Sequence, residues 1–163
     1  MLKLNGSINF QNIGYTIGPY INTANRIDAE DLAFELLTAE RNEDIQKTAM
    51  LLNDLNDQRK SEQRNLIKNL EADINNNPYE YSLVIKIKTS LTINGTIASI
   101  SGEKVQKPCV CFIDSDKDII KSSSRGIVDG LNLMNIFKFI KDQDPNIIVE
   151  AGGHKGAAGC SIS

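Results

Sequence analysis

The sequence predicts an α/β protein in which a long connecting helix is followed by a small α/β domain with a mixed sheet. Three observations support this fold class. Apolar side chains recur every three or four residues across much of positions 29–74, they alternate with polar ones over positions 81–88, and they form a continuous run at positions 108–113. The first pattern is typical of helices, the second of a half-buried strand and the third of a central strand.

The N-terminal part of the chain combines Gly, Asn and Ile, and over positions 1–27 we expect two short strand or loop segments. Pro19 disfavours the helical conformation of the glycine before it. Asp28 is the expected N-cap of a first helix, because its carboxylate can accept a hydrogen bond from the first turn. The helical pattern that begins at Leu32 ends near positions 40–42.

A second helix is expected over positions 43–74, which at about 1.5 Å per residue would be about 45 Å long. Its side chains are almost wholly polar at positions 56–65. A helical stretch without an apolar face is typical of a connector that crosses solvent. The sequence Asn-Asn-Asn-Pro at positions 75–78 ends the helix and marks the clearest boundary in the chain.

The remaining elements follow from the same patterns and form a small α/β domain over positions 79–163, near the lower size limit for independent folding. We expect a strand at 81–88, a short helix or turn at 95–105, a central strand buried on both faces at 108–113, a turn at 114–118, a returning strand at 119–121, a helix over 131–141, and two short apolar pieces, 147–149 and 161–163, around a Gly-rich segment.

Composition excludes several classes of protein. With 40% hydrophobic and 24% charged residues, the chain is neither disordered nor collagenous. It has no stretch of about 18 apolar residues, so we expect no membrane helix, and its first ten residues lack the apolar core of a secretory signal. Three Cys in such a chain are expected to be reduced thiols, which predicts a cytoplasmic protein.

The net charge of −3 is unevenly distributed. Positions 1–80 carry 8 basic and 13 acidic side chains, a balance of −5, whereas positions 81–163 carry 10 and 8, a balance of +2. So small a net charge argues against a protein that coats nucleic acid through its overall charge. It still permits a local basic groove in the second half of the chain.

The strongest local signal is the segment Gly-Gly-His-Lys-Gly-Ala-Ala-Gly at positions 152–159. Its bare backbone would let successive N–H groups converge on an anion, and His154 and Lys155 add side-chain donors. The spacing fits neither a Walker loop nor a dinucleotide-binding fingerprint. The alternative interpretation is a tight turn whose small residues permit close packing.

A second candidate is the sequence Ser122-Ser123-Ser124-Arg125-Gly126, which we expect at a strand end that leads into a loop. Three hydroxyl groups and a guanidinium suit a phosphate, which Arg can bind through two parallel hydrogen bonds. The alternative is an ordinary polar surface loop.

No metal site is expected. Cys109, Cys111, Cys160 and His154 are zinc-ligand types, but the first two lie in a run that we expect to be buried. The Asp-x-Asp-x-Asp pattern at 114–118 begins like a calcium loop, yet Ile and Arg stand where that loop needs Gly and Glu. One histidine is too few for a dinuclear hydrolase centre. The residues alone therefore predict neither a metal site nor a dinuclear hydrolase centre in this chain.

Six short segments share their order and spacing with those of one family. They are IGPYINTANRID (17–28), LAFELL (32–37), LLNDLNDQR (51–59), GTIAS with KP (95–99 and 107–108), Ser-Arg before Gly-Leu (124–125 and 130–131) and GGHKGAAGCSI (152–162). Together they resemble the RecJ-type single-stranded-DNA exonucleases of the DHH phosphoesterase superfamily, whose motifs include IGPRINAAGRLD, LAVELL and GGHAMAAGLSI.

The chain departs from the family's pattern at four positions. Tyr20 stands where the family has Arg, Asn25 where it has Gly and Gly126 where it usually has Ser, and Ser90 lies near the position of a missing His. We carry no substrate contact over to these positions. The resemblance implies that substrate is bound by the matching residues Asn22, Arg26, Ser124, Arg125, Gly152, Gly153 and His154.

The resemblance also implies a domain organisation. Residues 1–28 would be the C-terminal edge of a DHH catalytic domain, residues 29–77 the connecting helices, and residues 78–163 the DHH-associated nucleic-acid-binding domain. The family's catalytic aspartates and DHH triplet, which hold Mn²⁺ or Mg²⁺, would lie upstream of Met1. We therefore expect this chain to bind no metal and to be inactive alone.

The implied function is to bind the phosphates of single-stranded DNA for hydrolysis by the upstream DHH domain, in DNA repair and recombination. The expected partners are single-stranded nucleic acid and that catalytic domain, with no membrane. The alternatives are an associated domain of a DHH phosphodiesterase for short oligonucleotides or cyclic dinucleotides, and a protein-interaction module.

The helical arm carries two further expectations. Arg59, Lys60 and Arg64 are expected to form a solvated helix face, with contacts to a nucleic-acid backbone as the alternative. An exposed amphipathic arm also allows a homodimer through Leu52 and Leu55.

Overall fold

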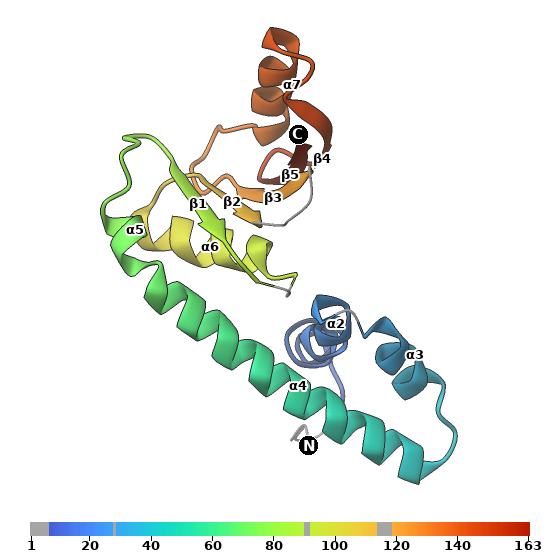
Figure 1. Ribbon diagram of the computed structural model, residues 1–163. Helices are drawn as coiled ribbons and strands as arrows, with labels where there is room; N and C mark the ends of the chain where they lie inside the picture. The colour runs from blue at the N-terminus through green and yellow to red at the C-terminus, as the bar shows by residue number, and fades with distance from the viewer. Residues whose placement is uncertain (1–6, 28, 90–91, 114–118) are drawn as a thin grey trace. The chain divides into compact units, whose positions relative to one another are not determined.

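The helices and strands lie in two parts of the chain, which we describe separately. The computed structural model describes residues 7–27, 29–89, 92–113 and 119–163 (Figure 1). Unit 1 is Met1–Arg64 with Ser90–Thr92, and unit 2 is Asn65–Thr89 with Ile93–Ser163. The division falls inside the long helix α4 (Asn42–Asn69). The domain boundaries after residues 28 and 77 stay a prediction.

Unit 1 begins with helices and not with the expected strands or loops. Helix α1 (Phe10–Asn12) continues through a π-helical turn, η1 (Ile13–Ile17), into α2 (Gly18–Arg26). Pro19 lies in the first turn of α2, where its missing N–H removes no intrahelical hydrogen bond. The residue before it is a glycine, which has no Cβ to clash with the proline ring, and it adopts helical angles (φ −57°, ψ −52°).

Two further helices follow the predicted break near position 40. Helix α3 (Glu30–Thr38) precedes α4, and the expected N-cap Asp28 lies outside the described residues. The helix predicted over positions 43–74 is divided at Leu70, after which α5 (Glu71–Asn75) begins. Leu70 and Ile74 are both buried in unit 2, so this end of the helix belongs to a core and not to a solvated connector.

The core of unit 1 joins α2, α3 and α4. Tyr20, Ala24 and Leu52 are buried together, and three partly buried side chains of α3 pack against them, Leu32, Ala33 and Leu36. Leu52 has no exposed surface. The structure therefore gives no support to a homodimer through Leu52.

Unit 2 is built on a five-stranded sheet in the order β1-β2-β3-β5-β4. Strands β1 and β2 are parallel and are connected through α6 (Asn94–Val105), whereas the other neighbouring pairs are antiparallel. The long helix and this small mixed sheet confirm the predicted fold class. The strands are β1 (Leu83–Ile87), β2 (Cys109–Ile113), β3 (Ile120–Arg125), β4 (Ile148–Gly153) and β5 (Ala157–Ile162).

One face of the sheet is covered by α6, which packs against β1, β2 and β3. The alternation predicted for β1 is confirmed, since its first, third and fifth side chains are buried and the others exposed. In register with them lie buried thiols of β2. The strand residues buried on this face are Leu83, Ile85, Ile87, Cys109 and Cys111.

The opposite face is covered by α7 (Leu133–Gln143), which packs against β4 and β5. Leu133 and Phe137 of this helix form a second core with Ile148, Ala158 and Cys160. Helix α7 covers this end of the sheet but leaves the outward side chains of β2 only partly buried. The prediction that β2 is buried on both faces is therefore wrong.

Strands β4 and β5 form a hairpin, so most of the Gly-rich segment is strand and not loop. His154 N–H donates to the Ala157 carbonyl at 2.8 Å across the turn. Gly153 has a φ of +133°, and a Cβ there would lie 2.5 Å from the Ala157 oxygen. Gly152 is different, because a Cβ there would have no atom within 4 Å.

This difference predicts that the two glycines respond oppositely to substitution. Gly153→Ala should lower the free energy of unfolding by about 2 kcal/mol, because it forces a strained φ and a backbone clash. Gly152→Ala should change it by less than about 0.5 kcal/mol. Urea denaturation followed by circular dichroism measures both, and equal losses would contradict the hairpin geometry.

Candidate nucleic-acid interface

Strand β3 positions the candidate phosphate ligands. The sequence Ser122–Arg125 was expected at a strand end that leads into a loop, and all four residues form the last part of β3, which ends at Arg125. Side chains alternate along a strand, so Ser123 and Arg125 project to the face opposite to that of Ser122 and Ser124. The contacts agree, because a Cβ on Gly95 of α6 would lie 2.8 Å from Arg125 Nη2 and 3.6 Å from Ser123 Oγ.

Ser124, one of the predicted substrate-binding residues, is buried and therefore not exposed to a ligand. It has no exposed surface, and it is in register with Ala158 of the α7 core. Ser123, which belongs to the candidate segment but not to the residues that the resemblance implies, is half-buried on the same face as Arg125. The period of two along β3 would have found Ser123, but the extent of the strand was not recognised in a run of three serines.

The side of β3, β5 and β4 that faces away from α7 forms one bare surface, which we call the open face. Arg125 is in register with Ala157, Lys121 with Ser161, and Gly152 with Gly159. A shallow hollow of about 230 Å³ lies along it, lined in part by Lys121, Glu150, Gly152, Gly159 and Ser161. The open face consists of Lys121, Ser123, Arg125, Glu150, Gly152, Ala157, Gly159 and Ser161.

Arg125 is held beside the first turn of α6. Its Nη1 donates to the Ser124 carbonyl at 2.9 Å, and its Nη2 occupies the space that the missing side chain of Gly95 leaves. The N-terminal end of a helix carries partial positive charge from its N–H groups. A guanidinium next to it therefore produces a locally cationic end of the open face, which is suited to an anion.

The hairpin turn does not form the expected cradle of N–H groups. His154 N–H donates to the Ala157 carbonyl, and Gly156 N–H donates to Nδ1 of His154 at 3.3 Å. These two donors are used within the hairpin and are not offered to an anion, which favours the alternative interpretation of the segment as a tight turn. Nδ1 of His154 is occupied by this hydrogen bond, so Nε2 is the ring nitrogen that the exposed His154 can offer to a ligand.

Asn22 and Arg26, the two predicted site residues of unit 1, lie one turn apart on α2. Asn22 is exposed, and Arg26 is half-buried. The Arg26 carbonyl accepts a hydrogen bond from Thr92 N–H at 3.1 Å. Their separation of four residues puts both side chains on one face of α2.

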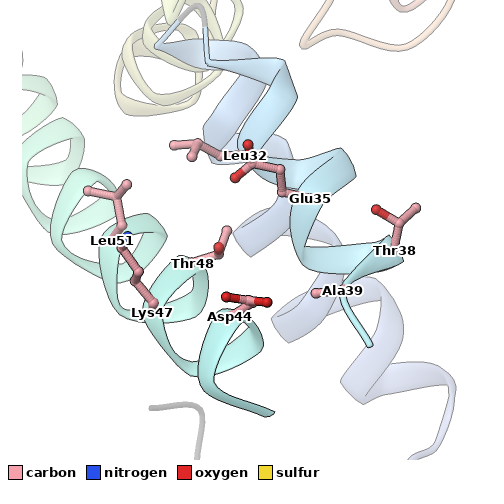
Figure 2. Close-up of a pocket in the computed structure, with 8 residues that line it drawn as sticks. All are labelled: Leu32, Glu35, Thr38, Ala39, Asp44, Lys47, Thr48 and Leu51. Carbon is pink, nitrogen blue, oxygen red and sulfur yellow. The ribbon is translucent and has the colours of Figure 1, made fainter. Parts of the chain in front are cut away.

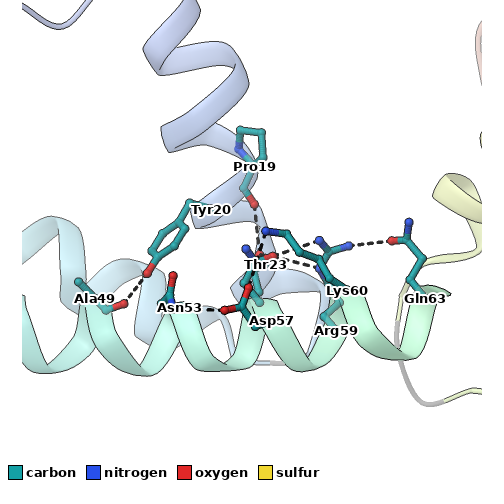
Figure 3. Close-up of polar contacts among 10 residues, drawn as sticks. Pro19, Tyr20, Thr23, Ala49, Asn53, Asp57, Arg59, Lys60 and Gln63 are labelled. Atoms are coloured by element: carbon teal, nitrogen blue, oxygen red, sulfur yellow. Dashed lines mark hydrogen bonds and ion pairs between the residues drawn. The ribbon is translucent and has the colours of Figure 1, made fainter. Parts of the chain in front are cut away.

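The polar stretch of α4 contains a packed network, which sequence reasoning missed. The Thr23 hydroxyl donates to Oδ1 of Asn56 at 2.9 Å, and Asn56 is only 8% exposed. Arg59 donates to the same oxygen through Nε and Nη2, at 3.3 and 3.1 Å (Figure 3). The expectation that positions 56–65 merely cross solvent is therefore wrong for the half of this stretch that packs on α2.

Tyr20 has a structural role at the position where the family motif has Arg. Its hydroxyl donates to the Ala49 carbonyl of α4, and Figure 3 shows the ring lying between the two helices. Burial, and then the negative charges of Asp57 and Asp54, raise the pKa of this hydroxyl. A buried neutral phenol of this kind fixes α2 on α4 and offers no cation to a ligand.

A hollow lies between α3 and α4 in unit 1. Its volume is about 470 Å³, and Figure 2 shows that the two helices each supply one wall. Glu35 and Asp44 line it together with one lysine, Lys47. Two carboxylates make this hollow a poor site for a phosphate.

The three cysteines are buried, free thiols. Burial raises the pKa of both Cys109 and Cys111 to about 12, and it also raises the pKa of Cys160. Across the ranges that the structure describes, no three His, Cys, Asp or Glu side chains are grouped so as to hold a metal ion.

Among the described helices, none is both long enough and apolar enough to span a bilayer.

Comparison with known proteins identifies one family, although no family model matches the chain. The chain is 31% identical over 157 residues to the single-stranded-DNA-specific exonuclease RecJ of Haemophilus influenzae, and 25% identical over 160 residues to RecJ of Bacillus subtilis. These matches cover 92% and 96% of the chain. The crystal structure of RecJ from Thermus thermophilus in complex with Mg²⁺ has the same fold over 93% of the chain, with a TM-score of 0.78 at 21% identity.

The chain is a RecJ-like region. It fits the C-terminal region of RecJ, and it spans only 27% of the length of the Haemophilus relative and 23% of the Thermus chain. Crystal structures of Thermus RecJ contain Mg²⁺ or Mn²⁺. The residues described here do not fit such an ion, since they contain one histidine, His154, and no cluster of acidic ligands.

The buried thiols of this RecJ-like region lead to a prediction about reactivity. At pH 8, iodoacetamide should leave Cys109 and Cys111 unmodified for hours, because a thiol with a pKa of about 12 is almost entirely protonated and the reagent needs the thiolate. Mass spectrometry after trypsin digestion measures the modification. Urea-unfolded protein is the control and should react within minutes, whereas rapid reaction of the folded protein would contradict the burial of β2.

Proposed function

We propose that this RecJ-like chain binds the phosphates of single-stranded DNA, and that a catalytic DHH domain elsewhere in the intact protein hydrolyses the phosphodiester bond. The observation that supports this most directly is the open face, where Arg125 and Ser123 lie beside a surface that has no side chain at Gly152. A phosphate backbone needs charged and hydroxyl donors together with room for close approach. The open face provides both.

Contacts of this kind hold and orient a strand without reading its sequence. Aromatic residues are only 6% of the chain, so base stacking contributes little and charge dominates the affinity. Binding by cations releases condensed counterions and therefore weakens as salt is raised. This function suits an exonuclease that must accept any sequence.

The hydrolytic step itself is assigned to the catalytic domain, with the Mg²⁺ or Mn²⁺ that RecJ crystal structures contain. A divalent ion bound in that domain would activate water and stabilise the departing oxygen. The role of this chain is to position the strand, and we expect it to hydrolyse nothing alone. Nuclease activity of the purified chain would contradict this assignment.

The phosphate-binding role predicts a salt-dependent affinity for a labelled single-stranded 20-mer, measured by fluorescence anisotropy. Arg125→Gln should weaken binding by about tenfold or more, because it removes a charged hydrogen-bond donor. His154→Ala should weaken it less. Lys141→Ala, which removes an exposed charge from α7, is the matched control and should change the affinity by less than about threefold. Equal effects of Arg125→Gln and Lys141→Ala would contradict the proposal.

Gly152→Val provides an independent test of the open face. A valine side chain there meets no protein atom at its Cβ, so the fold should persist, but the side chain would occupy the surface that a backbone needs. We expect a loss of affinity for the 20-mer with an unchanged melting temperature. Unchanged affinity would mean that the strand does not cross this face.

Two comparisons separate the alternative functions. A domain for short oligonucleotides or cyclic dinucleotides would bind a 3-mer or a cyclic dinucleotide as tightly as the 20-mer. A protein-interaction module is favoured by one observation, an apolar groove of about 350 Å³ lined in part by Val84, Phe112 and Ile136. Binding of a protein partner through this groove would be insensitive to Arg125→Gln and His154→Ala.

A further inference from the structure

The hollow between α3 and α4 contains a buried hydroxyl group without a partner. Thr48 of α4 is only 8% exposed and lines the hollow, and Figure 2 shows its side chain pointing from α4 toward α3. A threonine inside a helix often donates to the carbonyl four residues earlier. Thr23 and Thr38 do so, at 3.2 and 2.8 Å. Across the ranges that the structure describes, the Thr48 hydroxyl forms no hydrogen bond, so it is available to a molecule in the hollow.

The hollow also contains a carboxylate at an electrostatically unfavourable position. Glu35 lies in the last turn of α3, where the carbonyl groups at the end of a helix carry partial negative charge. That turn of α3 has no basic residue. Within the described residues, the Glu35 carboxylate has neither a hydrogen-bond partner nor an ion-pair partner. A cation that enters the hollow would relieve this repulsion.

Most of the polar groups that line the hollow are hydrogen-bond acceptors. Glu35 and Thr48 are joined there by the carboxylate of Asp44, whose Oδ2 pairs with Arg41 at 2.7 Å, while its Oδ1 remains. Lys47 also lines the hollow, but in the described part of the chain it pairs with neither carboxylate. The hollow therefore suits a ligand that donates several hydrogen bonds.

The surroundings of the hollow favour a cationic partner that also has an apolar part. Positions 30–47 carry six acidic and two basic side chains, a balance of −4. Apolar walls are supplied by Leu32, Ala39 and Leu51. A guanidinium group has only donors, and its aliphatic stem packs on apolar surface. Nucleic acid is disfavoured, because its phosphates carry the same sign of charge as this part of the chain.

We propose that the hollow between α3 and α4 is a docking site for the arginine side chain of a basic protein segment. The guanidinium lies between the carboxylates of Glu35 and Asp44 and donates to the Thr48 hydroxyl oxygen, and its stem lies on the apolar walls. Lys47 donates to a backbone carbonyl of the same segment. The site lies within unit 1, and it depends neither on the open face nor on the binding of DNA.

The first test uses two peptides that differ in one group. The probe is a fluorescein-labelled peptide of alanine and glycine with a central arginine, and the control peptide has citrulline, which keeps the shape but not the charge. In fluorescence anisotropy with the intact chain, the arginine peptide should bind about tenfold more tightly, because it makes charged hydrogen bonds. Equal affinities, or no binding of either peptide, would overturn the proposal.

A competition experiment tests whether the partner is a protein segment or a small guanidine compound. N-acetylarginine amide has the guanidinium but lacks the longer backbone that Lys47 contacts. It should displace the labelled peptide at a concentration about tenfold higher than the unlabelled arginine peptide does. Equal displacement would overturn the assignment of the hollow to a protein segment.

Two substitutions in α3 separate a local carboxylate from the overall charge. Glu35→Gln should weaken binding of the arginine peptide by about fivefold or more, because it removes a charged acceptor. Glu30→Gln removes the same charge from an exposed position on the opposite side of α3, and it should change the affinity by less than about twofold. Equal effects of the two substitutions would overturn a site in the hollow.

Thr48→Val tests whether the buried hydroxyl serves a ligand or the fold. The melting temperature should not fall, because the hydroxyl has no partner among the described residues, whereas the affinity for the arginine peptide should fall by about threefold or more. Thr23→Val is the matched control. The Thr23 hydroxyl donates to Asn56 at 2.9 Å, so its loss should lower the melting temperature. A lower melting temperature for Thr48→Val with unchanged affinity would overturn the proposal.

A direct measurement on the wild type covers the case in which a variant does not fold. In the ¹³C-labelled intact chain, the methyl resonance of Thr48 should shift in a saturable way on addition of the arginine peptide and should stay in place with the citrulline peptide. An unmoved resonance would overturn the proposal. Arg125→Gln should leave peptide binding unchanged, so this inference and the proposed function can fail independently.

Discussion

The antiparallel register of β3 with β5 is the constraint on which the candidate interface depends. It pairs Arg125 with Ala157 on the open face, and it pairs Ser124 with Ala158 on the face that packs against α7. A slip of one residue would bury Arg125 against Leu133 and Phe137 and would expose two serines instead. The hairpin between β4 and β5 sets the register of those two strands, and Gly153 with its positive φ permits the hairpin.

In unit 1, the packing of α2 on α4 depends on a polar contact at a position where helix interfaces usually have apolar residues. Thr23 and Asn56 meet in the interface between α2 and α4, and the same amide oxygen orients Arg59. The network therefore joins the packing of the helices to the direction of a charged side chain. Loss of the amide would affect both, which distinguishes this cluster from an ordinary solvated helix face.

Periodicity was sufficient to predict the elements whose burial is regular. The alternation from Leu83 to Ile87 and the helical spacing around Phe137 both correspond to real core faces. The N-terminal helices were missed because Gly14, Gly18 and Pro19 lower local helix propensity, while tertiary packing of Tyr20 and Ala24 stabilises the helix nonetheless. Helix propensity alone does not include the stabilisation that comes from tertiary packing.

The candidate site was predicted in part for the same reason. Arg125 and the Gly-rich segment stand out by residue type, and the structure puts them on neighbouring strands. A run of three serines has no apolar alternation, so the sequence does not tell which hydroxyl faces a ligand, and Ser124 was chosen over Ser123. The sequence also does not distinguish the roles of the two neighbouring glycines. Gly153 permits a positive φ, whereas Gly152 leaves the surface without a side chain.

The most direct test of the central claim, that nucleic acid binds to the open face, uses two adjacent alanines. Ala157 lies on the face of Arg125, and Ala158 is buried against α7. In protein labelled with ¹³C at alanine methyl groups, titration with a single-stranded 20-mer should shift the Ala157 methyl resonance in a saturable way and leave that of Ala158 in place. A shift of Ala158 without one of Ala157 would contradict the account.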